Sequence, residues 1–319
     1  MSEIPIFKQS KTINNRADGK GAAVKITDLT LPGRFWKFRY LYLMFLPAFV
    51  YFIMFSYYPF FKGILMSFQE NKLMGARPFA GLENYTYVLK DPDYIQAIIN
   101  SLIIGLADMV LYFGLSLVLA LCINEVGLRP VQKGLRTITY LPYLFSWSVI
   151  GGIWALAFNN QGIVNIVRGW FGAEPLFFLA EAKYARMLVI SMGVWRSIGY
   201  FAMLYSVSIF AIDPSLYEAA RIDGAGRFMQ ITRIIIPSLA GTMKVILVIL
   251  SISVLTHFDE IYVMQNPGNR RSIQTLLIYV YEVGITNFKL GTATAGATLV
   301  MAGTLVLAFI TRNVIKYDA

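Results

Sequence analysis

The sequence predicts an all-α integral membrane protein with about six transmembrane helices. Of its 319 residues, 57% are hydrophobic and 14% are charged, and the mean hydropathy is +0.58. Soluble domains carry charges on about a quarter of their residues. The apolar residues gather in runs of about 20 residues, which is the length that a helix needs to cross a bilayer. The net charge of +10 is typical of cytoplasmic loops that fix topology, and we do not expect a nucleic-acid partner.

Six apolar segments are expected to cross the membrane in turn. The predicted spans are 40–65, 95–123, 137–158, 187–211, 239–264 and 290–310. Pro47 and Pro59 are expected to bend the first span, because proline removes a backbone hydrogen bond. The connecting segments 69–93, 159–185 and 265–289 are expected on the outer side, with a short amphipathic piece over 163–171.

Residues 1–39 form a polar tail that is expected to be cytoplasmic, ahead of a transmembrane domain over 40–316 and a short end over 317–319. The tail lacks the apolar core of about 7–15 residues and the cleavage site of a signal peptide. Basic residues at the ends of a span favour the cytoplasmic side, so both termini are expected inside. These basic residues include Arg34, Lys37, Arg39, Arg129, Lys133, Arg136, Arg312 and Lys316.

Small residues are expected to carry the packing between spans, because lipid provides no hydrophobic drive for helix association. Gly151 and Gly152 lie in the third span, and Gly193 and Gly199 lie in the fourth. The sixth span holds a longer series, namely Gly291, Ala293, Ala295, Gly296, Ala297, Ala302 and Gly303.

A polar segment over 213–237 separates the fourth span from the fifth. Asp213 can cap a helix, and Pro214 suits the first helical position, where its missing N–H costs nothing. Gly224 allows the chain to turn out of that helix. A second short helix is then expected to run to Pro237. The sequence therefore predicts two short helices joined by a glycine turn at the membrane surface.

This segment resembles the EAA loop of permease subunits of binding-protein-dependent ABC importers. The Glu-Ala-Ala triplet at 218–220, Gly224, Ile234 and Pro237 fall at the spacing of that family, and Ile236 replaces its usual leucine. The segment from Phe79 to Tyr85 (Phe-Ala-Gly-Leu-Glu-Asn-Tyr) is similar to a pattern of the sugar-permease branch.

The resemblance implies the type I ABC importer permease fold in a bacterial cytoplasmic membrane, with both termini inside. It implies a second permease subunit, an ABC ATPase dimer that binds ATP and Mg²⁺, and an extracytoplasmic solute-binding protein. It also implies alternating access driven by the ATPases. The residues that it assigns to ATPase docking are Glu218, Ala219, Ala220, Arg221, Asp223 and Gly224.

The chain is not expected to be an enzyme by itself or to bind a cofactor or metal. It contains no Gly-x-x-x-x-Gly-Lys-Ser/Thr run for nucleotide phosphates. Its single histidine, His257, excludes a histidine-based metal cluster. His257 stands beside Asp259 and Glu260, where it could relay protons. The interpretation that we favour places it beside a water-filled cavity or at the outer interface.

The substrate path is expected among polar and aromatic side chains at span depth, which are costly there and usually functional. These candidates are Arg196, Trp195, Tyr200, Asn100 and Asp259. Aromatic faces with hydrogen-bonding groups suit a sugar. Arg196 could pair internally with Asp108 or Asp259. If it faces the substrate instead, an acidic oligosaccharide such as an alginate or pectin fragment fits best.

Two other classes of protein remain open at this point. An ion-coupled secondary transporter of a small polar solute would use carboxylates at mid-membrane, for which Asp108 and Asp259 are available, but internal repeats are not evident. A membrane-bound enzyme would need paired acids or metal ligands at one depth, and the sequence supplies neither. Dependence on ATP separates the importer from the secondary transporter.

Overall fold

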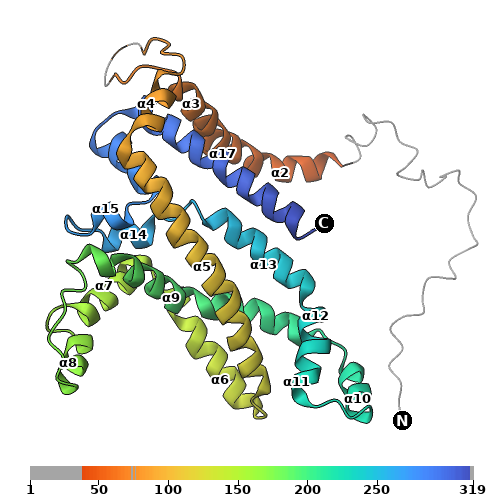
Figure 1. Cartoon of the computed structure of the whole chain (residues 1–319). Helices are drawn as coiled ribbons and strands as arrows, with labels where there is room; N and C mark the ends of the chain where they lie inside the picture. The colour runs from red at the N-terminus through yellow and green to blue at the C-terminus, as the bar shows by residue number, and fades with distance from the viewer. Residues whose placement is uncertain (1–37, 73–74, 76, 317–319) are drawn as a thin grey trace, which may run out of the picture. The chain divides into compact units, whose positions relative to one another are not determined.

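The computed structural model describes residues 38–72, 75 and 77–316, so the predictions for the tail and for 317–319 lie almost wholly outside the described residues. The chain divides into two units, 1–60 and 61–319, each described by itself. Within the described ranges the structure is helical, and its β pairing is an isolated bridge between Gln69 and Phe79 (Figure 1).

The first predicted span is a continuous helical run. It consists of α2 (Arg39–Phe52), a π-helical turn η2 (Ile53–Tyr57) and α3 (Tyr58–Ser67), and the two compact units meet within α3. Pro47 lies inside α2, and Pro59 is the second residue of α3, just after the π turn. Because proline has no N–H to donate, a local widening of the helix before it is a common accommodation.

The second, fourth and sixth predicted spans are confirmed as long helices in the second unit. They are α5 (Pro92–Glu125), α9 (Ala182–Phe210) and α17 (Leu290–Val314). The Asp91 side chain caps α5 by accepting a hydrogen bond from the Asp93 N–H at 2.9 Å. In Figure 1 α5 crosses α9, and this pair makes the most extensive contact among the described helices.

The third predicted span, over 137–158, is a broken helix in the structure. The structure has α6 (Arg129–Tyr140), a 3₁₀ turn η3 (Leu141–Leu144), α7 (Trp147–Phe158) and the short α8 (Ile163–Trp170), with a bend of 99° between the two halves. Two local signals explain the break. Pro142 opens the 3₁₀ turn, and Ser146 caps α7 by accepting from the Val149 N–H at 3.4 Å.

The fifth predicted span, 239–264, is also interrupted. Its helix α13 (Ala240–Ser253) ends before the chain restarts in α14 (Asp259–Met264), and it is bent by 61° from the helices before it. Those preceding pieces are α11 (Arg227–Gln230), the π turn η4 (Ile231–Ile235) and α12 (Ile236–Ser238). The segments that follow are α15 (Arg270–Ile273), α16 (Leu276–Tyr281) and the π turn η5 (Glu282–Thr286).

The number of spans depends on how these breaks are counted. Within the described residues, four helices are long and apolar enough to cross a membrane on their own, and six spans result if each bent pair is one span. The expectation of about six helices is therefore confirmed, although two of the six are not continuous helices.

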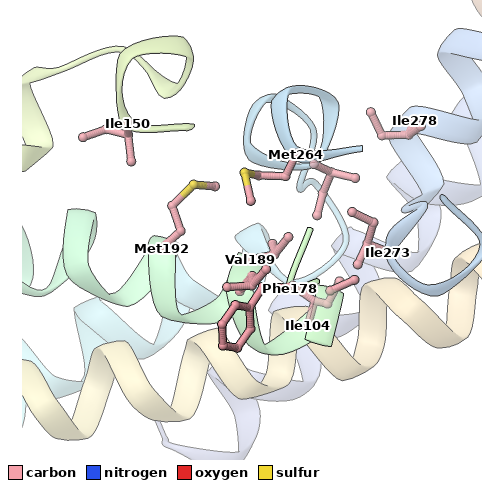
Figure 2. Close-up of a cluster of buried hydrophobic side chains, with 11 residues drawn as sticks. Ile104, Ile150, Phe178, Val189, Met192, Met264, Ile273 and Ile278 are labelled. Carbon is pink, nitrogen blue, oxygen red and sulfur yellow. The ribbon is translucent and has the colours of Figure 1, made fainter. Parts of the chain in front are cut away.

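One buried apolar cluster of the second unit lies where α5, α7 and α9 meet the segments after α13. Figure 2 shows apolar side chains from all of these elements converging on one another, among them Ile104, Ile150, Val189, Met192, Met264 and Ile273. Glycines allow the close approach. A Cβ on Gly199 would collide with the Thr139 carbonyl of α6, and one on Gly151 would collide with the Val263 side chain. Gly152 faces open space, so of the pair in the third span only Gly151 packs closely.

Candidate functional site

The polar segment after α9 folds as the sequence predicts. The Asp213 side chain accepts a hydrogen bond from the Ser215 N–H at 2.9 Å and starts α10 (Pro214–Ile222). The hydrogen bonds from Ser215, that of its backbone N–H first, hold the pKa of Asp213 below its ordinary value. Gly224 then turns the chain with φ +75°, a left-handed conformation that favours glycine. We call residues 213–237 the coupling loop.

The coupling loop presents a mixed apolar and charged surface. Glu218, Ala219, Arg221, Asp223 and Gly224 are exposed, and Ala220 is half-buried. Ile222 and Phe228 are 86% and 80% exposed. Large apolar side chains surrounded by charges typify a surface that docks another protein. The docking roles of these residues nevertheless stay predictions, since a partner chain is needed to test them.

The coupling loop is fastened to the ends of the long helices. Arg227 forms an ion pair with Glu125, the last residue of α5, with Nη2 2.7 Å and Nε 2.8 Å from Oε2. Tyr217 packs onto the core that α5 and α9 share. The loop is therefore attached to the end of α5 by this ion pair and to the α5–α9 cluster by Tyr217.

Of the alternatives that the sequence left open for Arg196, an ion pair with Asp108 or Asp259 is not found among the described residues. The Arg196 guanidinium donates to the Tyr143 and Phe145 carbonyls, both at 3.3 Å. It also lies over the rings of Tyr143 and Trp147, at 4.9 and 4.2 Å from their centroids. The break in the third span explains the contact, because it leaves backbone carbonyls without helical partners and Arg196 supplies donors to them.

Of the other predicted path residues, Tyr200 lies at this break with Arg196, whereas Trp195 faces α7. Tyr200 stacks on Tyr143 with ring centroids 4.3 Å apart. Trp195 is 42% exposed, and its ring lies 6.4 Å from that of Trp154. We define the Arg196 cluster as Tyr143, Trp147, Arg196 and Tyr200. Sequence reasoning missed Tyr143 and Trp147, although Pro142 and Ser146 mark the break that places them there.

Asn100 and Asp259, the other predicted path residues, lie in different surroundings. Asn100 is fully buried, and its amide donates to the Arg271 and Gln274 carbonyls at 3.0 and 2.9 Å. Its Oδ1 accepts from Arg186 of α9 at 2.8 Å. Asn100 therefore joins α5 and α9 to the segment around α15. Asp259 is exposed in the first turn of α14. Substrate contact by either residue stays a prediction.

A buried polar cluster joins α5 to the break after α13. His257 bonds through Nδ1 to Glu260, and its Nε2 lies 3.9 Å from Asp108 Oδ2. All three side chains are buried. Among the described residues, Asp108 Oδ1 and His257 Nε2 have no hydrogen-bond partner. The sequence indicated both Asp259 and Glu260 as neighbours of His257, and in the structure His257 contacts Glu260.

The segment from Phe79 to Tyr85 fixes the loop that precedes α5 to the sixth predicted span, α17. Asn84, in α4 (Glu83–Lys90), donates to the Ser67 and Gln69 carbonyls at 3.0 and 2.8 Å. Its Oδ1 accepts from Thr292 of α17 at 3.2 Å. Tyr85 shares a 2.7 Å hydrogen bond with Ser67. The asparagine and tyrosine of this pattern therefore have a structural role.

Comparisons with known proteins agree with one another. Residues 113–316 match the family described as binding-protein-dependent transport system inner membrane component. The polygalacturonan/rhamnogalacturonan transport system permease protein YteP of Bacillus subtilis (strain 168) is 30% identical, over 87% of this chain and 88% of its own length. The sn-glycerol-3-phosphate transport system permease protein UgpA of Brucella abortus biovar 1 is 29% identical, over 83% of this chain and 91% of its own length.

Solved structures show the same likeness. A chain of a bacterial ABC transporter involved in the import of the acidic polysaccharide alginate superimposes with a TM-score of 0.83 and 29% identity, covering 88% of this chain and 96% of that one. A chain of a bacterial alginate ABC transporter in complex with an alginate pentasaccharide-bound periplasmic protein gives the same TM-score with 28% identity, covering 91% and 99%.

Proposed function

This chain belongs to the family of binding-protein-dependent transport system inner membrane components, and we propose that it is a permease subunit of an ATP-driven importer that carries an oligosaccharide into a bacterial cell. The observation that carries the proposal is the likeness to saccharide permeases over nearly the whole chain. The chain is a multi-pass inner-membrane transport subunit and not an enzyme by itself. We further propose that both termini lie in the cytoplasm.

The proposed importer contains a second, related permease subunit, a pair of ABC ATPases and an extracytoplasmic binding protein. ATP and Mg²⁺ bind to the ATPases, and the energy reaches this chain through the coupling loop. The exposed Glu218–Gly224 surface and the apolar Ile222 and Phe228 support this docking role. A related transporter has been seen with its substrate-loaded periplasmic protein, which supports the proposed delivery of substrate from outside.

Movement of the coupling loop gives a physical route to alternating access. The Arg227–Glu125 ion pair and the packing of Tyr217 link the loop to α5 and α9. These two helices form the main packed pair of the second unit. When ATP closes the ATPases, the loop and the attached helix ends shift together, and the cavity changes from inward-facing to outward-facing.

The Arg196 cluster is the proposed contact site for the sugar. Its rings offer apolar faces, and the Arg196 guanidinium has five N–H donors, more than its two carbonyl partners require. A guanidinium also binds a carboxylate in a fork geometry. An acidic oligosaccharide, such as an alginate or pectin fragment, therefore fits better than a neutral one.

An ion-coupled secondary transporter is the alternative, and one observation favours it. The Asp108–His257–Glu260 cluster places two carboxylates and an imidazole inside the apolar helices, and such groups often mark ion or proton paths.

Uptake into proteoliposomes separates the two functions. The complex purified with its partners would be reconstituted with a loaded binding protein outside, and labelled galacturonate or mannuronate oligomers would be followed. The importer predicts uptake only with ATP at the ATPase side, insensitive to ionophores. Uptake that needs an ion gradient and ignores ATP would overturn the proposal.

A further inference from the structure

We propose that the chain carries a second saccharide subsite, separate from the Arg196 cluster, in a pocket between α14 and η5. This subsite would bind one pyranose ring of the chain through its apolar face and its hydroxyl groups. The inference rests on the proposed function, because only an importer of oligosaccharides has use for a further ring site. The pocket, here called the outer pocket, is lined by Tyr262, Gln265, Arg270, Ile278, Tyr281, Glu282, Thr286 and Asn287.

The outer pocket has the size and the aromatic surface that a sugar needs. Its volume of about 460 Å³ lies within the range of about 300–1,000 Å³ that is typical of small-molecule sites. The rings of Tyr262 and Tyr281 are nearly perpendicular, at 81°, with centroids 5.5 Å apart. Phe258 stacks behind Tyr262 at 5.6 Å and supports it. A pyranose ring can therefore place its C–H face against one tyrosine while the other closes the side of the site.

Glu282 organises the polar side of the outer pocket. It accepts hydrogen bonds from Gln265 Nε2 at 2.8 Å and from Gln274 Nε2 at 2.6 Å, and it forms an ion pair with Arg270. These three partners hold the carboxylate in one position before any ligand arrives. Preorganised polar groups lower the cost of ordering a site on binding.

Two groups in this network retain hydrogen-bonding capacity. Gln265 Oε1 is buried and has no hydrogen-bond partner among the described residues. Its orientation is fixed, because Nε2 of the same amide is bound to Glu282. A buried acceptor without a donor is costly, which marks Gln265 as the least satisfied polar side chain among the described residues that line the outer pocket. The Arg270 side chain is 51% exposed and has further N–H donors for a ring or hydroxyl oxygen.

The chemistry of the outer pocket differs from that of the Arg196 cluster. The charge of Arg270 is balanced by Glu282, so the pocket recognises hydroxyl groups and a ring face in preference to a carboxylate. The contribution of the outer pocket to uptake should therefore depend on the length of the saccharide and not on its charge.

Helices that carry the two sites pack against each other. Tyr262 lies on α14, whose next residue, Val263, contacts Gly151 of α7. Gly151 is one helical turn from Trp147, a member of the Arg196 cluster. An extended oligosaccharide can thus contact both sites, whereas a short one can be held by the Arg196 cluster alone.

The experiment compares saccharides of two lengths in the reconstituted, ATP-driven complex. Uptake of oligomers of two and five residues, in the galacturonate and the mannuronate series, would be measured for the wild type, Tyr281→Ala and Tyr281→Phe. Phe171→Ala serves as the matched control, because Phe171 is an exposed aromatic residue outside the outer pocket. ATP hydrolysis without substrate reports whether each complex is assembled.

The subsite predicts that Tyr281→Ala lowers uptake of the five-residue oligomers about tenfold and changes uptake of the two-residue oligomers less than about twofold, as expected for the loss of one ring contact. Tyr281→Phe should retain most of the uptake because it keeps the ring. If Tyr281→Ala does not assemble, Gln265→Leu should give the same dependence on length.

Three results would overturn the inference. Equal losses at both lengths, or no loss at either length in a complex that transports, would refute the subsite while leaving the proposed function intact. A wild-type complex that takes up neither series would refute the proposed function, and the subsite with it.

Discussion

Replacement of Arg196 by glutamine tests the substrate path most sharply. Glutamine keeps hydrogen-bonding capacity but removes the charge and the planar guanidinium that lies over Tyr143 and Trp147. If Arg196 binds a carboxylate of the substrate, the change removes a charge-assisted hydrogen bond worth about 1.5–3 kcal/mol. Apparent affinity for an acidic oligosaccharide should then fall about 10- to 100-fold.

The same change should also have a modest structural cost. Each cation–π contact at a partly exposed site contributes about 0.5–1 kcal/mol, and the two 3.3 Å hydrogen bonds to the carbonyls are long. We therefore expect a stability loss of about 1–3 kcal/mol, measured as a lower unfolding temperature in detergent. Arg196→Lys is the control, because it keeps the charge and loses the stacking.

The assay is uptake of charged and neutral oligosaccharides of equal length into proteoliposomes. Arg196→Gln should selectively lower uptake of the charged oligosaccharide. Uptake of that oligosaccharide by Arg196→Lys should lie between the values for Arg196→Gln and the wild type. Unchanged uptake of a uronate oligomer by Arg196→Gln would refute the reasoning. A loss that is equal for charged and neutral sugars would mean that Arg196 only supports the break in the third span.

Three further predictions follow from contacts in the second unit. Gly199→Ala should destabilise the protein by about 1–3 kcal/mol because a backbone carbonyl occupies the space, whereas Gly152→Ala, in open space, should leave the unfolding temperature unchanged. Arg227→Ala and Glu125→Ala should each weaken stimulated ATPase activity two- to fivefold at most, because an exposed ion pair contributes about 0.2–1 kcal/mol. The double variant should lose no more activity than either single variant, and additive losses would mean that the ion pair does not act as a link. Asp213→Ala should reduce stimulated ATPase activity because it removes the cap of α10. In the wild type, the stabilisation from this cap should be complete above the ordinary aspartate pKa and should be lost as the pH falls through the lowered pKa of Asp213. Stabilisation that persists below that lowered pKa would contradict this.

The spans with uninterrupted apolar composition were predictable from the sequence, and so was the coupling loop. The capping aspartate, the proline after it and the left-handed glycine are local signals, and each acts where it stands in the chain. The long helices α5, α9 and α17 follow from length and hydropathy alone.

The breaks were not predicted, because hydropathy does not report backbone direction. Residues 137–158 read as one apolar run, yet Pro142 and Ser146 turn the chain within it. Acidic residues in the first turn of α14 mark a helix start inside the predicted fifth span. The break at Pro142 and Ser146 exposes the Tyr143 and Phe145 carbonyls to which Arg196 donates.

Hydrogen-bond partners that are far apart in the sequence could not be predicted from any sequence pattern. Asn100 bonds to Arg186 and to the carbonyls of Arg271 and Gln274, far along the chain. Asp108 approaches His257 only because α5 passes the break after α13. Periodicity can place a residue on a helix face, but it cannot show which element that face meets.

The most direct test of the central claim is a co-purification from native membranes followed by an ATPase assay. We predict that an ABC ATPase and a second permease co-purify with the chain, and that a loaded binding protein stimulates ATP hydrolysis. Glu218→Lys in the coupling loop should abolish the stimulation, while Glu174→Lys, outside the loop, should not. A chain that purifies alone, transports on an ion gradient and is indifferent to Glu218→Lys would contradict the account.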